Sequence, residues 1–278
     1  MSLAMRVVRS EYTKVISTRM WWVLALVMFG YVGLSTAGIS LVFGLNLGGD
    51  GGGAPGTPPG GPSFDPSALP PLIYSFASSI GYVFPLLIGA LAVTNEFRHQ
   101  TLTPTFLASP RRGPVLGGKL ANGLLFGALY GIVGLLASVG IGALILSLLD
   151  IDPLLGESDT WALIGRVVLA MALWGAIGVG VGTLIPSQVG SIVVILAFTQ
   201  FLEPILRLAA SFVDVLGEVA QYLPGAASDA LVGASFFAVA GPMTGPALQW
   251  WQGGLVLAGY AVLFTVLGFV TSWRRDVT

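Results

Sequence analysis

The sequence contains no cysteine, and only one of its 278 residues, His99, is a histidine. Without cysteine, disulfides, thiolate metal sites and cysteine nucleophiles are excluded within this sequence. A single histidine leaves almost no material for a histidine-rich metal site or a Ser-His-Asp triad. We therefore expect no catalytic residues in this chain, and no metal or other cofactor bound by it.

Charged residues are also scarce. They make up 9% of the sequence, against about 25% in ordinary soluble domains, whereas apolar residues make up 55%. A soluble fold could not cover its surface with so few charges, so we expect lipid around most of the chain. The net charge of −1 gives no bulk electrostatic reason to expect a nucleic-acid partner.

The sequence instead contains long apolar stretches. Six of them approach or exceed the roughly 20 residues that a bilayer-spanning helix needs. They cover residues 20–45, 72–93, 120–149, 161–185, 188–206 and 253–272. The sequence thus predicts an all-α integral membrane protein, with six spans in a single transmembrane domain over residues 1–278.

The charges outside these stretches sort by sign. With six spans, ten of the twelve basic residues fall on one side of the membrane, and ten of the thirteen acidic residues fall on the other. Lysine and arginine accumulate on the cytoplasmic side, so both termini are predicted to be cytoplasmic. Trp250, Trp251 and Trp273, at the two ends of the sixth span, suit the aromatic belts of a membrane protein.

Three segments outside the spans have a composition of their own. Residues 47–71 are rich in glycine and proline, which predicts a flexible outer loop. Residues 2–18 carry an apolar stripe beside basic residues, which predicts an amphipathic helix on the inner membrane surface. Residues 209–245 are apolar and interrupted by Pro224 and Gly225, which predicts one or two short helices that re-enter or lie on the outer leaflet.

Residues 113–120, GPVLGGKL, are similar to a phosphate-binding loop in their glycine spacing. In such a loop a serine or threonine holds Mg²⁺ after the lysine and a strand precedes the glycines. Here Leu120 follows the lysine, and the preceding residues include Arg111 and Arg112. We therefore expect no nucleotide site. Arg111, Arg112 and Lys119 are expected to meet anionic headgroups at the start of the third span.

Glycines recur within two spans at spacings that let helices approach closely in lipid. They are Gly123, Gly127 and Gly131 in the third span and Gly178, Gly180 and Gly182 in the fourth. Their expected role is helix packing, either within the chain or between two copies.

The spans contain few ionisable residues that could bind a coupling ion. No acid lies near the centre of any span, although an ion-driven carrier normally binds its coupling ion there. Glu203 and Arg207 lie four residues apart near the outer end of the fifth span. They are expected to form either an interfacial ion pair or an outer gate. If the protein moves a substrate, the energy is expected to come from a partner on the basic side.

Three segments resemble the permeases of type-2 ATP-binding cassette (ABC) transporters. Residues 9–22 are similar to the family's opening, E-x-x-K followed by an arginine and an aromatic residue, with Glu11, Lys14 and Arg19 at the matching positions. Residues 94–120 are similar to its first cytoplasmic loop, E-[FY]-R-x-x-T…T-x-L-x-x-P-x-R followed by a lysine. The matching positions there are Glu96, Phe97, Arg98, Thr101, Thr105, Leu107, Pro110, Arg112 and Lys119. Residues 221–231 are similar to the segment before the family's last span.

The resemblance covers essentially the whole chain and implies a multi-pass permease subunit of an exporter, in the plasma membrane of a bacterium. The implied partners are two copies of a separate ATPase subunit, which would bind ATP and Mg²⁺, a second identical or related permease, and membrane lipid. Residues 2–18 would act as an elbow helix and residues 94–118 as the loop that couples to the ATPase. The implied coupling residues are Glu96, Phe97, Arg98, Thr101, Thr105, Phe106, Leu107 and Arg112.

The same resemblance implies a substrate path between two permease copies, mainly along the second and fifth spans. Its candidate residues are Phe76, Ser79, Phe84, Ser191, Ile195, Phe198 and Thr199. The apolar, glycine-rich spans favour a hydrophobic or amphiphilic substrate such as a drug, an antimicrobial compound or a lipid. Two alternatives stay open: a non-transporting membrane anchor or sensor subunit, and an ion-driven carrier.

Overall fold

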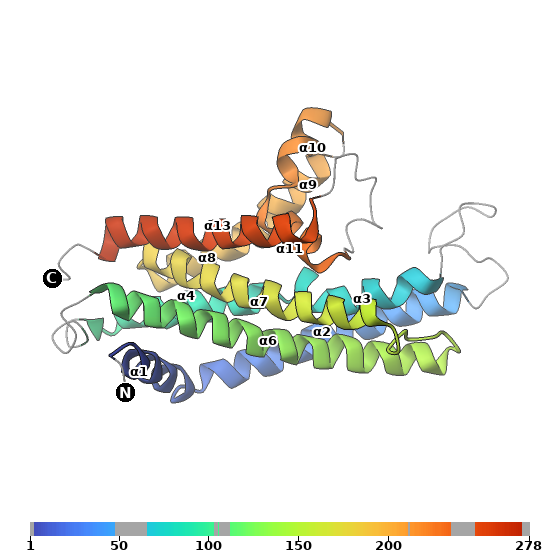
Figure 1. The fold of residues 1–278 in the computed structure, drawn as a ribbon, viewed down its shortest axis with the longest axis horizontal. Coiled ribbons are helices and arrows are strands. Elements are labelled where there is room, and N and C mark those ends of the chain that lie inside the picture. Colours follow the sequence, from blue (N-terminus) through green and yellow to red (C-terminus); the bar gives the residue numbers. More distant parts are fainter. Residues whose placement is uncertain are drawn as a thin grey trace.

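The computed structural model describes residues 3–47, 66–102, 105, 112–210, 212–234 and 248–273. Every secondary-structure element in these residues is a helix (Figure 1), as the sequence predicts. Six helical segments are long and apolar enough to cross a membrane, which confirms the predicted number of spans. They are Met20–Leu45, Pro66–Arg98, Arg112–Leu148, Ser158–Leu184, Gln188–Ala210 and Trp250–Trp273. Which end faces the cytoplasm stays a prediction.

The first four spans are built from five α-helices and a short 3₁₀ turn, after an N-terminal helix. In chain order they are α1 (Leu3–Ile16), α2 (Met20–Leu47), η1 (Pro66–Ala68), α3 (Leu69–Ser79), α4 (Val83–Arg98), α6 (Arg112–Leu148) and α7 (Ser158–Leu184). The glycine-rich residues 113–120 form the first turns of α6, so this span starts earlier than predicted. Pro114 is tolerated there because the first turn of a helix does not need its N–H groups.

The fifth and sixth spans contain π-helical segments, and two short helices precede the sixth. In chain order the elements are α8 (Gln188–Ala197), η2 (Phe198–Leu202), α9 (Glu203–Ala210), α10 (Asp214–Ala220), α11 (Pro224–Val232), α13 (Trp250–Gly268) and η3 (Phe269–Trp273). At the end of η2, the Glu203 N–H reaches back to Phe198 O. Pro204 follows directly, and its missing N–H and bulky ring disfavour a regular α-helix here.

The second span is not the continuous helix that the sequence predicts, because it breaks between Ser79 and Val83. Pro85 has no N–H, and in a continuous helix its ring would clash with the carbonyl of Gly81. Gly81 is also crowded: an added Cβ would meet Ala77 O and would lie 2.9 Å from Met28 Cε. The span therefore consists of two helices, α3 and α4, with a break inside the bundle.

The second and fourth spans form the centre of the bundle. In their most apolar windows 78% of the residues are buried, against 22–39% in the other four spans. The glycines explain how α7 fits between its neighbours. A Cβ on Gly123 of α6 would lie 2.7 Å from Val179 Cγ2 of α7, and a Cβ on Gly180 of α7 would lie 2.9 Å from Phe264 Cβ of α13. The predicted glycine packing is confirmed, and the observed contacts are within the chain.

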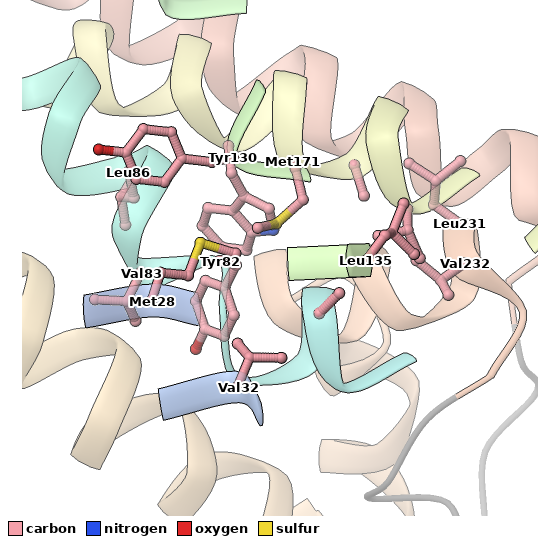
Figure 2. Packing of buried hydrophobic residues seen from close by; sticks show 14 of the residues in the cluster. Met28, Val32, Tyr82, Val83, Leu86, Tyr130, Leu135, Met171, Leu231 and Val232 are labelled. Atoms are coloured by element: carbon pink, nitrogen blue, oxygen red, sulfur yellow. The ribbon is translucent and has the colours of Figure 1, made fainter. Parts of the chain in front are cut away.

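The short helices α9, α10 and α11 differ in how they pack against the bundle. Helices α9 and α10 extend away from the bundle (Figure 1). Helix α11 packs against α13, α7 and α3, and its Leu231 and Val232 are buried. Figure 2 shows these two side chains in the same cluster as Met28 and Val32 of α2. Thus α11 is part of the core.

Trp273 corrects the expectation of an aromatic belt at that end of the sixth span. Only 1% of Trp273 is exposed. Its Nε1 donates to Arg112 O at 3.3 Å, while Arg112 Nη1 donates to Trp273 O at 2.9 Å. The ring of Phe97 meets the Trp273 ring edge-on at 6.0 Å. Trp273 therefore joins the ends of α4, α6 and η3.

Candidate functional site

Four charged residues meet at the end of the bundle that holds α1. We call Glu11, Lys14, Glu96 and Lys119 the charge quartet. Lys14 Nζ lies 2.6 Å from Glu11 Oε1 and 2.6 Å from Glu96 Oε1. Lys119 Nζ lies 2.6 Å from Glu11 Oε2 and 2.9 Å from Glu96 Oε2. Each lysine contacts both carboxylates, so the four charges form a closed ring and cancel.

Most of the charge quartet is buried. The side chain of Lys119 is 1% exposed and those of Glu11 and Glu96 are 6% and 7% exposed. Lys119 therefore pairs with carboxylates inside the protein, and the expectation that it meets lipid headgroups is wrong. Burial acts to lower the pKa of Lys14, but hydrogen bonds to Glu11 and Glu96 outweigh it and raise this pKa above its ordinary value. Lys14 thus stays charged at neutral pH.

Small and polar residues of α6 hold α1 in place beside the quartet. A Cβ on Gly118 would lie 2.7 Å from Val7 Cγ1, so glycine is needed for α1 to approach this closely. Asn122 Nδ2 donates to Val8 O and to Gly118 O, each at 3.0 Å. Lys119 Nζ also donates to Ala92 O of α4 at 3.3 Å. One turn of α6 therefore holds both α1 and α4.

Of the other predicted coupling residues that the structure describes, Thr105 contacts the quartet, whereas Arg98 contacts α8. Arg98 Nη1 donates to Gln188 Oε1, at the start of α8, at 2.9 Å. Thr105 Oγ1 donates to Thr101 O at 2.8 Å and receives a 3.5 Å hydrogen bond from Lys14 Nζ. Arg19 is exposed between α1 and α2. Phe106 and Leu107 lie outside the described residues.

A second cluster of charges lines a cavity beside the break in the second span. We call this the break cavity; it has a volume of about 90 Å³ and is lined by residues of α2, α3, η2, α9 and α11. Arg207 Nη2 lies 2.8 Å from Asp229 Oδ2, while Arg207 Nε lies 3.8 Å from Glu203 Oε1. The Glu203–Arg207 pair is present as predicted, but Arg207 lies nearer to Asp229.

Glu203 is held by the start of α11. Its Oε1 accepts a hydrogen bond from Gly225 N at 2.6 Å, where the helix dipole favours a negative charge. A Cβ on Gly225 would lie 2.8 Å from Glu203 Cδ, so the glycine makes room for the carboxylate. Only 2% of Glu203 is exposed. This contact ties the fifth span to α11.

Asp229 is the site residue that the sequence reading missed. The segment 209–245 is expected to form short helices that re-enter or lie on the outer leaflet, and within it α11 carries Asp229 into the bundle, where it is 9% exposed. Ser79 Oγ donates to Asp229 Oδ1 at 3.4 Å. The small residues Gly225, Ala226 and Ala227 are the signal that could have indicated a buried helix, because they allow close packing.

Two of the candidate path residues lie at the break cavity. Ser79 and Thr199 line the break cavity, where Tyr82 OH donates to Thr199 O at 3.1 Å. The remaining candidates are distributed over the core and the helix faces. Phe76, Ser191 and Ile195 are buried, and Phe84 and Phe198 are half-buried. A path along these residues between two copies stays a prediction.

Comparison of the sequence with protein-family models and with curated proteins gives no match. The resemblance to type-2 ABC permeases therefore rests on the quoted residues alone, and it stays a prediction.

Proposed function

We propose that the chain is the membrane-spanning permease subunit of an ABC exporter. In this proposal two copies of a separate ATPase subunit bind ATP and Mg²⁺, and a second permease copy completes the substrate path. The permease lies in the plasma membrane of a bacterium, with both termini in the cytoplasm. The substrate is a hydrophobic or amphiphilic compound.

The observation that carries this proposal is the charge quartet. Glu11 and Lys14 belong to the first segment that resembles the family, and Glu96 and Lys119 belong to the second. These segments are far apart in the sequence, yet their charged residues form one ring of contacts of 2.6–2.9 Å. A shared arrangement in space supports the view that the two likenesses have one structural cause.

The quartet also provides a route by which a force on residues 94–118 would be transmitted to the spans. This segment joins α4 to α6, and the quartet links both helices to α1. Arg112 and Trp273 add a link to η3, and Arg98 adds a link to Gln188 of α8. A force applied by an ATPase would therefore displace these helix ends together.

The first test replaces Phe106 and Leu107, the predicted contact with the ATPase, by alanine in the full permease–ATPase complex. We expect the permease to insert normally, ATP hydrolysis to continue and transport to be lost. The matched control replaces Leu144 and Leu148, which are exposed on α6, by alanine. Wild-type transport in the Phe106/Leu107 variant would refute the coupling role of these two residues.

The permease role itself has a separate test. The purified chain should hydrolyse no ATP alone and should stimulate ATP hydrolysis by a cognate ATPase when a substrate is added. ATP hydrolysis that responds to no candidate substrate would instead favour a non-transporting anchor or sensor subunit.

The break cavity favours a second candidate function, the ion-driven carrier. Such carriers bind their coupling ion at interrupted helices with ionisable side chains, and Glu203, Arg207 and Asp229 lie beside an interrupted span. A protonophore or a sodium ionophore, added at constant ATP, separates the two functions. Transport that persists supports the ATPase-driven permease, and transport that stops supports the carrier.

A further inference from the structure

The break cavity has a size that suits a small ligand. Its volume of about 90 Å³ has room for a small ion with a few waters. Drug-sized ligands occupy sites of about 300–1,000 Å³. The cavity is therefore too small to be the path for a hydrophobic substrate.

The charges around the cavity leave one negative charge over, because two carboxylates share one guanidinium. Arg207 lies 2.8 Å from Asp229 and only 3.8 Å from Glu203 Oε1. Glu203 Oε2 is buried and forms no hydrogen bond within the described residues. Leaving such a charge unbalanced away from water costs several kcal/mol. The start of α11 offsets part of this charge, and a positive ligand would balance the rest.

Four of the hydroxyls in the lining are compatible with the same ligand. The hydroxyls of Ser78, Tyr82 and Thr199 donate their protons to Ser75 O, Thr199 O and Ile195 O, respectively. Ser79 Oγ donates to Asp229. With these protons committed, the four hydroxyl oxygens can meet a ligand only through lone pairs, and Thr199 Oγ1 already accepts a hydrogen bond from Gln200 Nε2 at 3.4 Å. In addition, α3 ends at Ser79, so the negative end of its dipole lies beside the cavity.

We infer that the break cavity binds one small monovalent cation, Na⁺ or K⁺, through Glu203 Oε2 and the hydroxyl oxygens of the lining. Hard cations prefer such oxygen ligands. A proton on Glu203 would balance the charge but would leave the space beside it unexplained. The bound cation joins α3, η2 and α9, and so stabilises the bundle at the break. This inference requires neither an ATPase nor transport.

The test measures the midpoint of thermal unfolding of the full chain purified in detergent. NaCl or KCl replaces N-methyl-D-glucamine chloride in steps, at constant ionic strength and pH. A cation that binds only the folded protein raises the midpoint as its concentration passes the dissociation constant. We expect this rise with at least one of the two salts.

The Glu203→Gln variant keeps an oxygen for Gly225 N but removes the charge, and we expect it to lose the salt response. The matched control, Glu218→Gln, changes an exposed acid on α10 and should respond like the wild type. If Glu203→Gln does not fold, Ser79→Ala provides the test. It removes one neutral ligand, so the response should move to about tenfold higher salt.

Three results would overturn the inference. The midpoint of the wild type could be the same in all three salts. Glu203→Gln could respond to NaCl and KCl as the wild type does, which would place any cation elsewhere. The midpoint could also follow pH while ignoring both salts, which would identify a proton as the only ligand.

Discussion

At the scale of single residues, Lys119 links three helices through its ion pairs. The lysine of a glycine-rich stretch resembles that of a nucleotide-binding loop, yet here it is 1% exposed and forms ion pairs with two carboxylates, which it shares with Lys14. The missing serine or threonine after it was the informative sign in the sequence. The carboxylate partners were not predictable, because Glu11 and Glu96 reach Lys119 only through the packing of α1 and α4.

The first prediction concerns Lys119→Met, which removes a charge while keeping a long side chain. Glu11 and Glu96 are then left with Lys14 alone, and an uncompensated buried carboxylate costs about 3–5 kcal/mol. We expect a markedly lower midpoint of thermal unfolding in detergent. The double variant Lys119→Met with Glu11→Gln restores the charge balance and should recover part of the loss. An unchanged midpoint in the single variant would show that the quartet adds no stability.

The second prediction concerns pH, through Lys14. Its pKa is raised from the ordinary value of 10.5 in the folded protein. A group with a raised pKa contributes stability below its unfolded pKa and loses it as pH rises through the folded pKa. The difference in unfolding midpoint between the wild type and Lys14→Met should therefore be constant from pH 6 to about 9 and shrink above about 10.5. A difference that already disappears near pH 8 would contradict the observed pairing.

At the scale of helices, α7 depends on glycine where it crosses α6. A Cβ on Gly175 would meet Gly123 O and would lie 3.1 Å from Gly127 Cα, which are backbone atoms that cannot move aside. Gly165 of the same helix has nothing within 4 Å of an added Cβ. The two positions therefore separate the effect of packing from the effect of helix propensity.

The third prediction compares Gly175→Val with Gly165→Val. Both changes introduce the same β-branched residue into α7, but only the first forces two helices apart, and overpacking costs typically 1–3 kcal/mol or more. We expect Gly175→Val to reduce the yield of monodisperse protein in detergent and to lower its unfolding midpoint. Gly165→Val should resemble the wild type. Equal effects of the two substitutions would mean that the α6–α7 contact does not require the glycine.

The helices also show what the sequence could and could not predict. The six spans follow from apolar length alone, and the glycine faces follow from their spacing. The break in the second span has a local cause in Pro85, but a proline within an apolar stretch can also be tolerated in a membrane helix. The burial of α11 depends on contacts with α3, α7 and α13, which no local pattern contains. For that reason neither the place of Asp229 beside the break nor the break cavity is predictable from the sequence.

For the whole molecule, the orientation predicted from the charges leads to a fourth prediction, and the absence of cysteine makes it simple to test. Ser17→Cys lies after α1, and Gly156→Cys lies in the exposed turn before α7. A membrane-impermeant maleimide applied to intact cells should label Gly156→Cys only. Applied to inside-out vesicles, it should label Ser17→Cys only. Labelling of both positions from the same side would refute the predicted topology.

The break at Gly81 determines how movement can pass through this bundle. A continuous helix would carry an axial shift from Arg98 straight to Pro66 through its backbone ladder. Here the backbone hydrogen bonds of α4 reach back to Tyr82 O and Gly81 O, and the Tyr82 hydroxyl donates sideways to Thr199 O at 3.1 Å. A displacement that starts near Arg98 is therefore transferred to the neighbouring span halfway along its course, and α3 can keep its position while α4 moves.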